Sequence, residues 1–324
     1  MMKKRLWSRW ILALAVVWPC MAAAHDRVRE KENFDFDWKF ILNADDRANA
    51  GMQVSETGWQ DVQLPHDWSI SQNFDPKLSG SNGHLPGGIG WYWKTFRVDK
   101  KDKRRRIAVL FDGIYSRSDV YVNGQHLGFR PYGFCYQEYD LTPYLNYGAE
   151  NVLAVRVNNP LEHDSVARWY TGAGIYRHAW LVKTAEVHVA SYGTYVTTPV
   201  VTAERAEVRV RTSVANEAKR TKTLSVRQQI TDGEGRTVVQ SGKQTLQVAA
   251  GQTADTEHTL EIPRPQLWDT EHPYLYTLHT AVYDGRKLVD TYETVFGVRT
   301  CEFTPDRGFL LNGKPLKLKG FCLH

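Results

Sequence analysis

The sequence predicts an all-β protein made of two successive sandwiches, followed by one further strand. Asn-Gly or Asp-Gly dipeptides, which tolerate the positive φ angles of tight hairpins, recur along the chain, as at 123–124 and 284–285. Between such turns apolar and polar residues alternate: Val208, Val210 and Val214 face one way and the intervening residues the other. Convincing helical periodicity is absent from the sequence after residue 24. Short strands with regularly spaced turn signals favour sandwiches.

The first 24 residues have the pattern of a cleaved secretory signal peptide. A basic start contains Lys3, Lys4, Arg5 and Arg9. A short apolar run at 11–17 and the small residues 22–24 follow, and the run is too short to span a bilayer. Cys20 raises the alternative of lipidation, but the bulky pair before it disfavours that processing. We therefore expect a periplasmic or secreted bacterial protein.

Charge and cysteine content point to no special partner. The net charge of +5 includes four cations of the leader, so the remainder is nearly neutral and predicts no nucleic-acid partner. One basic run, 100–106, is predicted to be the solvated tip of a hairpin. Cys135, Cys301 and Cys322 are an odd number without paired spacing, so no disulfide framework is expected.

Composition changes near residue 186. The stretch 25–186 is rich in aromatic residues and long loops, whereas 187–297 is dominated by Thr and Val and has the strand rhythm of an immunoglobulin-like sandwich. A loop is expected at 263–273. The last stretch, 298–324, is too short for a core of its own. Its segment 314–323 is predicted to be a strand with exposed apolar residues, which suggests that the chain is cut inside a third domain.

Nine motifs, in order along nearly the whole sequence after the leader, resemble glycoside hydrolase family 2 in its bacterial β-galactosidase branch. They are LPHDW at 64–68, GIGWY at 88–92, FDGIY at 111–115, YVNG at 121–124 with Gly128, YDLT at 139–142, NVLAVRV at 151–157, RWYTGAGIYR at 168–177, FGVR at 296–299, and LNG at 311–313 with KG at 319–320. Each motif is weak alone, and the ordered set is strong.

The resemblance implies a jelly-roll domain over 25–186, an immunoglobulin-like domain over 187–297, and the first strand of a truncated TIM barrel over 298–324. Family members hydrolyse β-glycosides with retention through two carboxylates on later barrel strands. We therefore expect the N-terminal portion of an exo-acting β-glycosidase, most similar to β-galactosidases. Its catalytic carboxylates would lie outside this chain, which we expect to be inactive alone. No cofactor is expected. The ending FCLH at 321–324 departs from the VNRH-type segment of many members, and β-glucuronidase and β-mannosidase stay open.

Three residues are predicted to bind substrate. The resemblance places His324 at the end of the first barrel strand, where it would help bind the sugar ring. It places Arg168 and Trp169 on a jelly-roll loop that reaches the active-site rim, where Arg would donate to hydroxyls and Trp would stack on the ring. The alternatives are that His324 is only a structural residue at a strand end, and that Arg168 and Trp169 only dock the domains. Gly172 and Gly174 are expected to permit the tight backbone of that loop.

Other suggestive pairs are predicted to be structural. The family's acid/base normally occurs as an Asn-Glu pair, but Asn216-Glu217 falls in a turn between two alternating strands. His66-Asp67 and the stretch 163–165 suggest a triad, yet the sequence has no Gly-x-Ser-x-Gly elbow. Neither His-Glu-x-x-His nor Cys-x-x-Cys occurs, so no metal site is predicted.

A second hypothesis is a non-catalytic carbohydrate-binding protein of two sandwiches. The aromatic content is 12%, with 11 Trp, and flat rings can stack on sugars as well as fill cores. Under either hypothesis the partner is a β-linked oligosaccharide or glycan, with no nucleic acid and no membrane span. The oligomeric state and the sugar specificity stay open.

Overall fold

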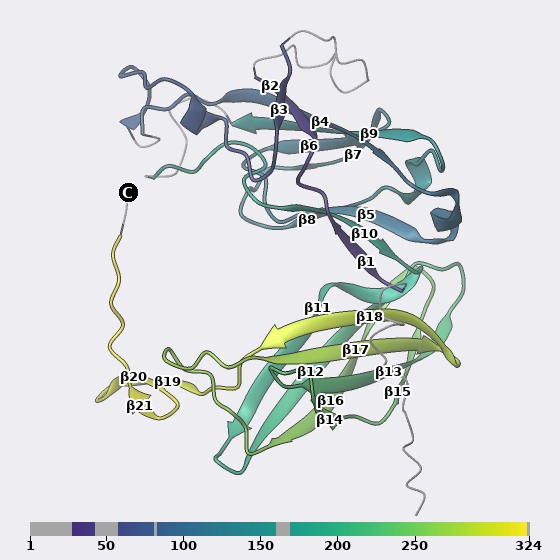
Figure 1. The fold of residues 1–324 in the computed structure, drawn as a ribbon, viewed down its shortest axis with the longest axis vertical. Coiled ribbons are helices and arrows are strands. Elements are labelled where there is room, and N and C mark those ends of the chain that lie inside the picture. The colour runs from purple at the N-terminus through teal and green to yellow at the C-terminus, as the bar shows by residue number, and fades with distance from the viewer. Residues whose placement is uncertain (1–27, 43–57, 81–82, 160–168, 323–324) are drawn as a thin grey trace, which may run out of the picture.

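The computed structural model describes residues 28–42, 58–80, 83–159 and 169–322. It confirms the all-β prediction, with a jelly-roll sandwich followed by an immunoglobulin-like sandwich. Figure 1 shows the first sandwich above the second, joined where β1 and β10 approach β11 and β18. None of the helices in these ranges is long and apolar enough to cross a membrane.

The first sandwich consists of a six-stranded and a four-stranded antiparallel sheet. The sheet orders are β3-β2-β4-β9-β6-β7 and β1-β10-β5-β8. The strands are β1 (Glu30–Asn33), β2 (Trp38–Leu42), β3 (Gln60–Val62), β4 (Gly88–Arg97), β5 (Arg106–Phe111), β6 (Ser118–Val122), β7 (Gln125–Arg130), β8 (Gln137–Asp140), β9 (Glu150–Asn159) and β10 (Ala179–Thr184). Short 3-10 turns are η1 (Ser69–Ser71), η3 (Lys100–Arg104) and η4 (Thr142–Tyr144).

Aromatic side chains fill the core between these two sheets. Trp38 and Tyr92 are fully buried, and their rings meet edge to face with centroids 6.4 Å apart. Trp68 is also fully buried and stacks on Phe40 at 5.4 Å. Several of the Trp residues are therefore core residues, since burying a large ring removes much apolar surface from water.

The second sandwich contains eight strands within the described residues, one more than a seven-strand rhythm. A three-stranded sheet, β11-β12-β16, faces a five-stranded sheet in which β14-β13-β17-β18 are neighbours and β15 also pairs with β13. The strands are β11 (Val187–Val201), β12 (Arg205–Asn216), β13 (Lys222–Thr231), β14 (Thr237–Gln240), β15 (Gln244–Val248), β16 (Gln252–Pro263), β17 (Tyr276–Asp284) and β18 (Lys287–Phe296). The predicted alternation is confirmed, because Val208, Val210 and Val214 are all buried.

A polar layer divides the core of the second sandwich into two apolar clusters. The buried amide of Gln228 donates to Thr212 Oγ1 at 2.8 Å, and its carbonyl oxygen accepts from Thr280 Oγ1 at 2.7 Å. These three residues come from β13, β12 and β17, so the layer connects both sheets. The nitrogen and the oxygen of the Gln228 amide therefore both have hydrogen-bond partners, as buried polar groups require.

The predicted strand at 314–323 is wrong in extent. The final small sheet contains β19 (Cys301–Thr304), β20 (Gly308–Leu311) and β21 (Lys314–Pro315), and 316–322 have no regular structure. Backbone there has no neighbouring strand among the described residues, and a lone strand cannot satisfy its hydrogen bonds. Phe321 is 98% exposed. Residues 323 and 324 lie outside the described ranges.

The prediction of a hairpin at 100–106 is wrong, although Lys100, Lys101, Lys103 and Arg104 are exposed as expected. This run connects β4 to β5, which belong to different sheets, so it crosses between the layers of the sandwich. Arg106 is mostly buried and contacts Glu138 and Glu217 at 2.8 Å each. Charge density alone could not distinguish a crossover from a hairpin, because both connections expose some cations.

Candidate functional site

The predicted substrate-binding residues are only partly placed. Arg168 and His324 lie outside the described residues. Trp169 begins the described segment 169–178, which leads into β10, and is 49% exposed. In Figure 1 the start of this segment and the C-terminal stretch project to the same side of the view.

Asp67 anchors the segment that begins at Trp169. Its Oδ2 accepts a hydrogen bond from the Tyr170 hydroxyl at 2.5 Å, next in sequence to Trp169. Its Oδ1 accepts from the backbone N–H groups of Ser69 and Ala173, at 3.0 and 3.1 Å. One carboxylate thus binds both its own turn and a segment about a hundred residues further along. Charge-assisted bonds of this kind are among the stronger ones in proteins.

Backbone hydrogen bonds align the same two segments. His66 N–H donates to Ile175 O at 2.9 Å, and Trp68 N–H donates to Ala173 O at 3.1 Å. The motifs at 64–68 and 168–177 are therefore one structural unit, which we call the Asp67 loop unit (residues 64–68 and 169–177). His66-Asp67 has this anchoring role, in agreement with its prediction as structural.

Gly174 is required by both conformation and space. Its φ is +126°, and a Cβ there would lie 2.6 Å from His66 O and in contact with the Tyr92 hydroxyl. Gly172 also has a positive φ, +80°, and faces the Asp67 carboxylate. The expectation that these glycines permit a tight backbone is confirmed.

Three titratable side chains are neutral here, His66 and Tyr170 in the loop unit and Tyr92 beneath it. The Tyr92 hydroxyl lies 2.8 Å from His66 Nδ1. Burial raises the pKa of Tyr92 well above its usual value and lowers the pKa of His66, although the nearby Asp67 charge opposes the latter shift. Burial, together with its bond to Asp67, likewise raises the pKa of Tyr170. These groups act as hydrogen-bonding supports at neutral pH.

An aromatic surface continues from the loop unit onto the segment before β8. The ring of Phe134 lies 5.0 Å from that of Tyr115, 5.7 Å from Tyr132 and 6.3 Å from Tyr176. Tyr176 belongs to the loop unit, and its hydroxyl donates to Gly133 O at 3.0 Å. Tyr132 and Phe134 are both about half exposed. These two residues give the surface exposed flat rings suited to stacking on sugars or on another domain.

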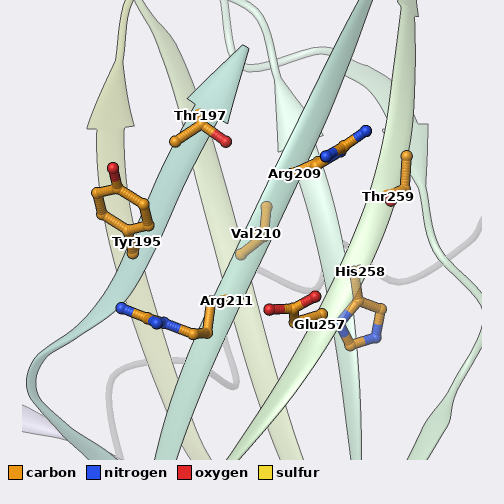
Figure 2. Close-up of a pocket in the computed structure, with 8 residues that line it drawn as sticks. All are labelled: Tyr195, Thr197, Arg209, Val210, Arg211, Glu257, His258 and Thr259. Carbon is orange, nitrogen blue, oxygen red and sulfur yellow. The ribbon is translucent and has the colours of Figure 1, made fainter. Parts of the chain in front are cut away.

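A second surface, on the outer face of β11-β12-β16, is a solvated charged ladder. Figure 2 shows Tyr195, Arg209, Arg211 and Glu257 around a hollow of about 210 Å³. Arg209 contacts Glu207 at 2.6 Å, and the Arg211 guanidinium lies 5.4 Å from the Tyr195 ring centroid. Its cations therefore already have partners, and nothing in its geometry favours a particular ligand.

The Asn216-Glu217 pair is structural, as predicted. The buried Asn216 amide donates to Arg220 O and Val248 O at 2.9 and 3.0 Å, which fixes the turn after β12. Glu217 Oε1 accepts from Arg106 Nε at 2.8 Å. Within the described ranges, His, Cys, Asp and Glu side chains form no group of three that could hold a metal ion.

Sequence comparison identifies two domains of one family. Residues 32–185 match Glycosyl hydrolases family 2, sugar binding domain, and residues 187–299 match Glycosyl hydrolases family 2. A β-galactosidase of Bacteroides ovatus is 41% identical, covering 94% of this chain and 36% of that protein. A β-glucuronidase of Formosa agariphila is 33% identical, covering 90% and 32%.

Solved structures give the same result. A glycosyl hydrolase family 2 member from Bacteroides cellulosilyticus superimposes with a TM-score of 0.82 at 38% identity, covering 91% of this chain and 38% of that one. A family 2 β-glucuronidase gives a TM-score of 0.81 at 32% identity, covering 90% and 32%. The chain spans about a third of the length of these relatives. Its two domain matches and its fold show that it belongs to glycoside hydrolase family 2.

Proposed function

We propose that this chain is the N-terminal, non-catalytic part of a retaining, exo-acting β-glycosidase that removes β-linked galactose in carbohydrate catabolism. The support is the family, together with the β-galactosidase of Bacteroides ovatus at 41% identity. The two catalytic carboxylates of a retaining mechanism would lie on a barrel that follows this sequence. By itself the 324-residue chain would then be inactive.

The observation that carries the proposal is the Asp67 loop unit. Asp67 holds Tyr170 and Ala173, and this fixes the backbone next to the half-exposed Trp169. A ring presented from a rigid loop can stack on a sugar without a large entropic cost of ordering. We assign Trp169 to the rim of the substrate site. Arg168 and His324 would add hydrogen bonds to sugar hydroxyls.

The galactoside assignment competes with a glucuronide. Relatives of 33% and 34% identity are a β-glucuronidase and a putative β-glucuronidase of Formosa agariphila. We favour galactose because the β-galactosidase relative is more similar, at 41%. β-Mannosidase activity is the remaining alternative from the sequence. The leader at 1–24 further supports export to the periplasm or beyond, where the polymeric substrates of such enzymes occur.

The test compares two proteins, the 324-residue chain and the product of the gene with its downstream coding region. Both are assayed on p-nitrophenyl β-galactoside, β-glucuronide and β-mannoside. We expect hydrolysis only by the longer product, with the galactoside preferred. Turnover by the 324-residue chain, lost on mutation of its own residues, would contradict the proposal. An in-frame stop after His324, with a stable sugar-binding product, would favour the binding-protein alternative.

The rim role of Trp169 needs its own variants in the longer product. Trp169→Ala should raise KM for the preferred glycoside about fivefold, since stacking contributes on the order of 1 kcal/mol, and Trp169→Phe should recover part of this loss. Tyr195→Ala is the matched control, because Tyr195 is also exposed (61%) but lies on the second sandwich. An unchanged KM in Trp169→Ala would remove Trp169 from the site.

A further inference from the structure

A pocket lies at the junction of the two sandwiches. It has a volume of about 370 Å³ and is lined by Lys31 of β1, Val182 of β10, Ser191 of β11 and Thr291 of β18, among others. Figure 1 shows these four strands meeting between the sandwiches. The volume falls within the range of small-molecule sites. We call this the junction pocket.

Lys31 places an ammonium group in the junction pocket, and this group donates no hydrogen bond to a described residue. Its Nζ lies 4.0 Å from the centroid of the Trp180 ring, and no acceptor among the described residues is within bonding distance. The contact with the ring fixes the ammonium group while leaving its three N–H donors open. Partial burial lowers the pKa of Lys31; the Asp112 carboxylate opposes this shift, and the positive charge of Arg29 adds to it.

Hydroxyl groups also line the junction pocket. Neither Ser191 nor Thr291 uses its hydroxyl in a hydrogen bond to a described residue, and both line the junction pocket. Glu293, also a lining residue, is 66% exposed at its side chain and contacts His279 Nδ1 through Oε1 at 3.1 Å. The other Glu293 oxygen can accept from a ligand hydroxyl. The negative charge of Glu293 disfavours the binding of compact polyanions through repulsion.

The junction pocket is preorganised by contacts between the sandwiches. Tyr192, in a bulge of β11 with φ +54°, donates its backbone N–H to the Tyr292 hydroxyl at 3.0 Å. Its own hydroxyl donates to Asp112 at 3.2 Å, and Asp112 also accepts from Trp180 Nε1 at 2.9 Å. The ring beneath Lys31 is thereby held in place from both sandwiches. A ligand would therefore not have to order the Trp180 and Tyr192 side chains on binding.

From these contacts we infer that the junction pocket binds a sugar acid, with the carboxylate on Lys31 and the ring hydroxyls on Ser191, Thr291 and Glu293. The Lys31 ammonium group, whose N–H donors have no acceptor among the described residues, matches one carboxylate. The unused hydroxyls and the Glu293 carboxylate match a neutral polyol, which both donates and accepts. This ligand would bind without reaction, at a site separate from the Asp67 loop unit. The inference does not depend on the glycosidase proposal.

The test is calorimetric titration of the chain with glucuronate, glucose and acetate at equal, low ionic strength. Glucuronate should bind. Glucose and acetate should each bind at least about tenfold more weakly, because glucose lacks the carboxylate and acetate lacks the ring hydroxyls. Lys31→Met should weaken glucuronate binding about tenfold and leave glucose unchanged. Lys243→Met is the matched control, since Lys243 likewise lies over a ring (Tyr283, 5.0 Å) but not in this pocket.

A second variant keeps the inference testable if Lys31→Met fails to fold. Thr291→Val retains shape and removes one hydroxyl, so glucuronate should bind several-fold more weakly while acetate is unaffected. Equal affinity for acetate and glucuronate would overturn the sugar-acid assignment in favour of a simple anion site. Unchanged glucuronate affinity in either folded variant, or the absence of measurable binding at tens of millimolar, would overturn it entirely.

Discussion

Arg29 and Asp290 lie 261 positions apart and join the two sandwiches through a two-point ion pair. Arg29 Nε and Nη2 donate to Asp290 Oδ1 and Oδ2 at 3.1 and 2.8 Å. The Asp290 side chain is fully buried, and Oδ2 also accepts from the Val189 N–H at 2.7 Å. Arg29 donates as well to Val189 O at 2.5 Å and lies 4.8 Å from the Tyr292 ring centroid. The segment before β1 is therefore fixed to the second sandwich.

Replacing Asp290 by Ala should destabilise the protein by about 3 kcal/mol, because an Arg with 13% exposure loses its counter-ion. The control is Asp61→Ala. Asp61 contacts Lys39 at 2.8 Å but is 89% exposed, so its loss should cost less than about 1 kcal/mol. Urea denaturation measures both. Similar midpoints for the two variants would show that the buried pair does not hold the sandwiches together.

Replacing Asp67 by Ala should free the Asp67 loop unit while the sandwich cores stay folded. Tyr170, Ser69 and Ala173 each lose an acceptor, and we expect a loss of about 2–4 kcal/mol. Hydrogen exchange at the amide of Ala173 should accelerate far more than exchange in β13. Uniform acceleration across both sandwiches would instead indicate global destabilisation and contradict a local anchor.

Gly174→Ala should be poorly tolerated, with a loss of more than about 3 kcal/mol. The added Cβ meets His66 O at 2.6 Å, and φ is +126°. Gly285→Ala is the control, because φ is +61° but no atom lies within 4 Å, which leaves only the backbone penalty of about 1–2 kcal/mol. Thermal melting compares the two variants. A Gly174→Ala midpoint equal to that of Gly285→Ala would mean that the loop unit can shift aside.

Stability should fall as the solution is acidified below the ordinary histidine range. Burial, and then the positive Arg106 and Arg29, lower the pKa of His188 from 6.5 to about 3. Between these values only the unfolded chain binds this proton, so the contribution is complete above 6.5 and is lost as pH falls towards 3. From pH 6.5 to about pH 5 the expected loss is on the order of 2 kcal/mol.

His188→Gln separates this effect from the rest of the acid response. The variant also loses the contact of Nδ1 with Ala185 O at 3.1 Å, so it should be less stable at pH 7.5. Its stability should nevertheless fall less steeply on acidification than that of the unchanged chain. Burial also lowers the pKa of His258, so this residue should contribute part of the pH dependence of stability that remains in the variant. Parallel slopes for the variant and the unchanged chain would assign the acid response to other groups.

Local patterns predicted the strands because each strand buries one face. The alternation at Val208, Val210 and Val214 required no knowledge of the partner strand. The Asn123-Gly124 turn is confirmed for the same reason, with φ angles of +48° and +82° between β6 and β7. The segment 314–323 was predicted wrongly, because a strand also needs a neighbour, and sequence alone does not show which neighbour is present.

Contacts between distant segments could not be predicted. The sequence shows Asp67 only as the neighbour of His66. The fold brings Tyr170 and Ala173 to its carboxylate. Gln228 similarly occupies a position where alternation predicts an apolar residue. Thr212 and Thr280 satisfy its amide from other strands. In both cases the sequence shows the residue, and the three-dimensional arrangement determines its role.

The position of β10 affects how the first sandwich is made. β10 lies between β1 and β5, so the four-stranded sheet lacks an inner strand until residue 184 has been synthesised and has left the ribosome. Until then β1 has no neighbour in this sheet, and the core side chains of β5 stay uncovered. Such long-range pairing slows folding and leaves a nascent chain open to misassociation. A chaperone that delays collapse until β10 emerges should therefore raise the yield of folded protein.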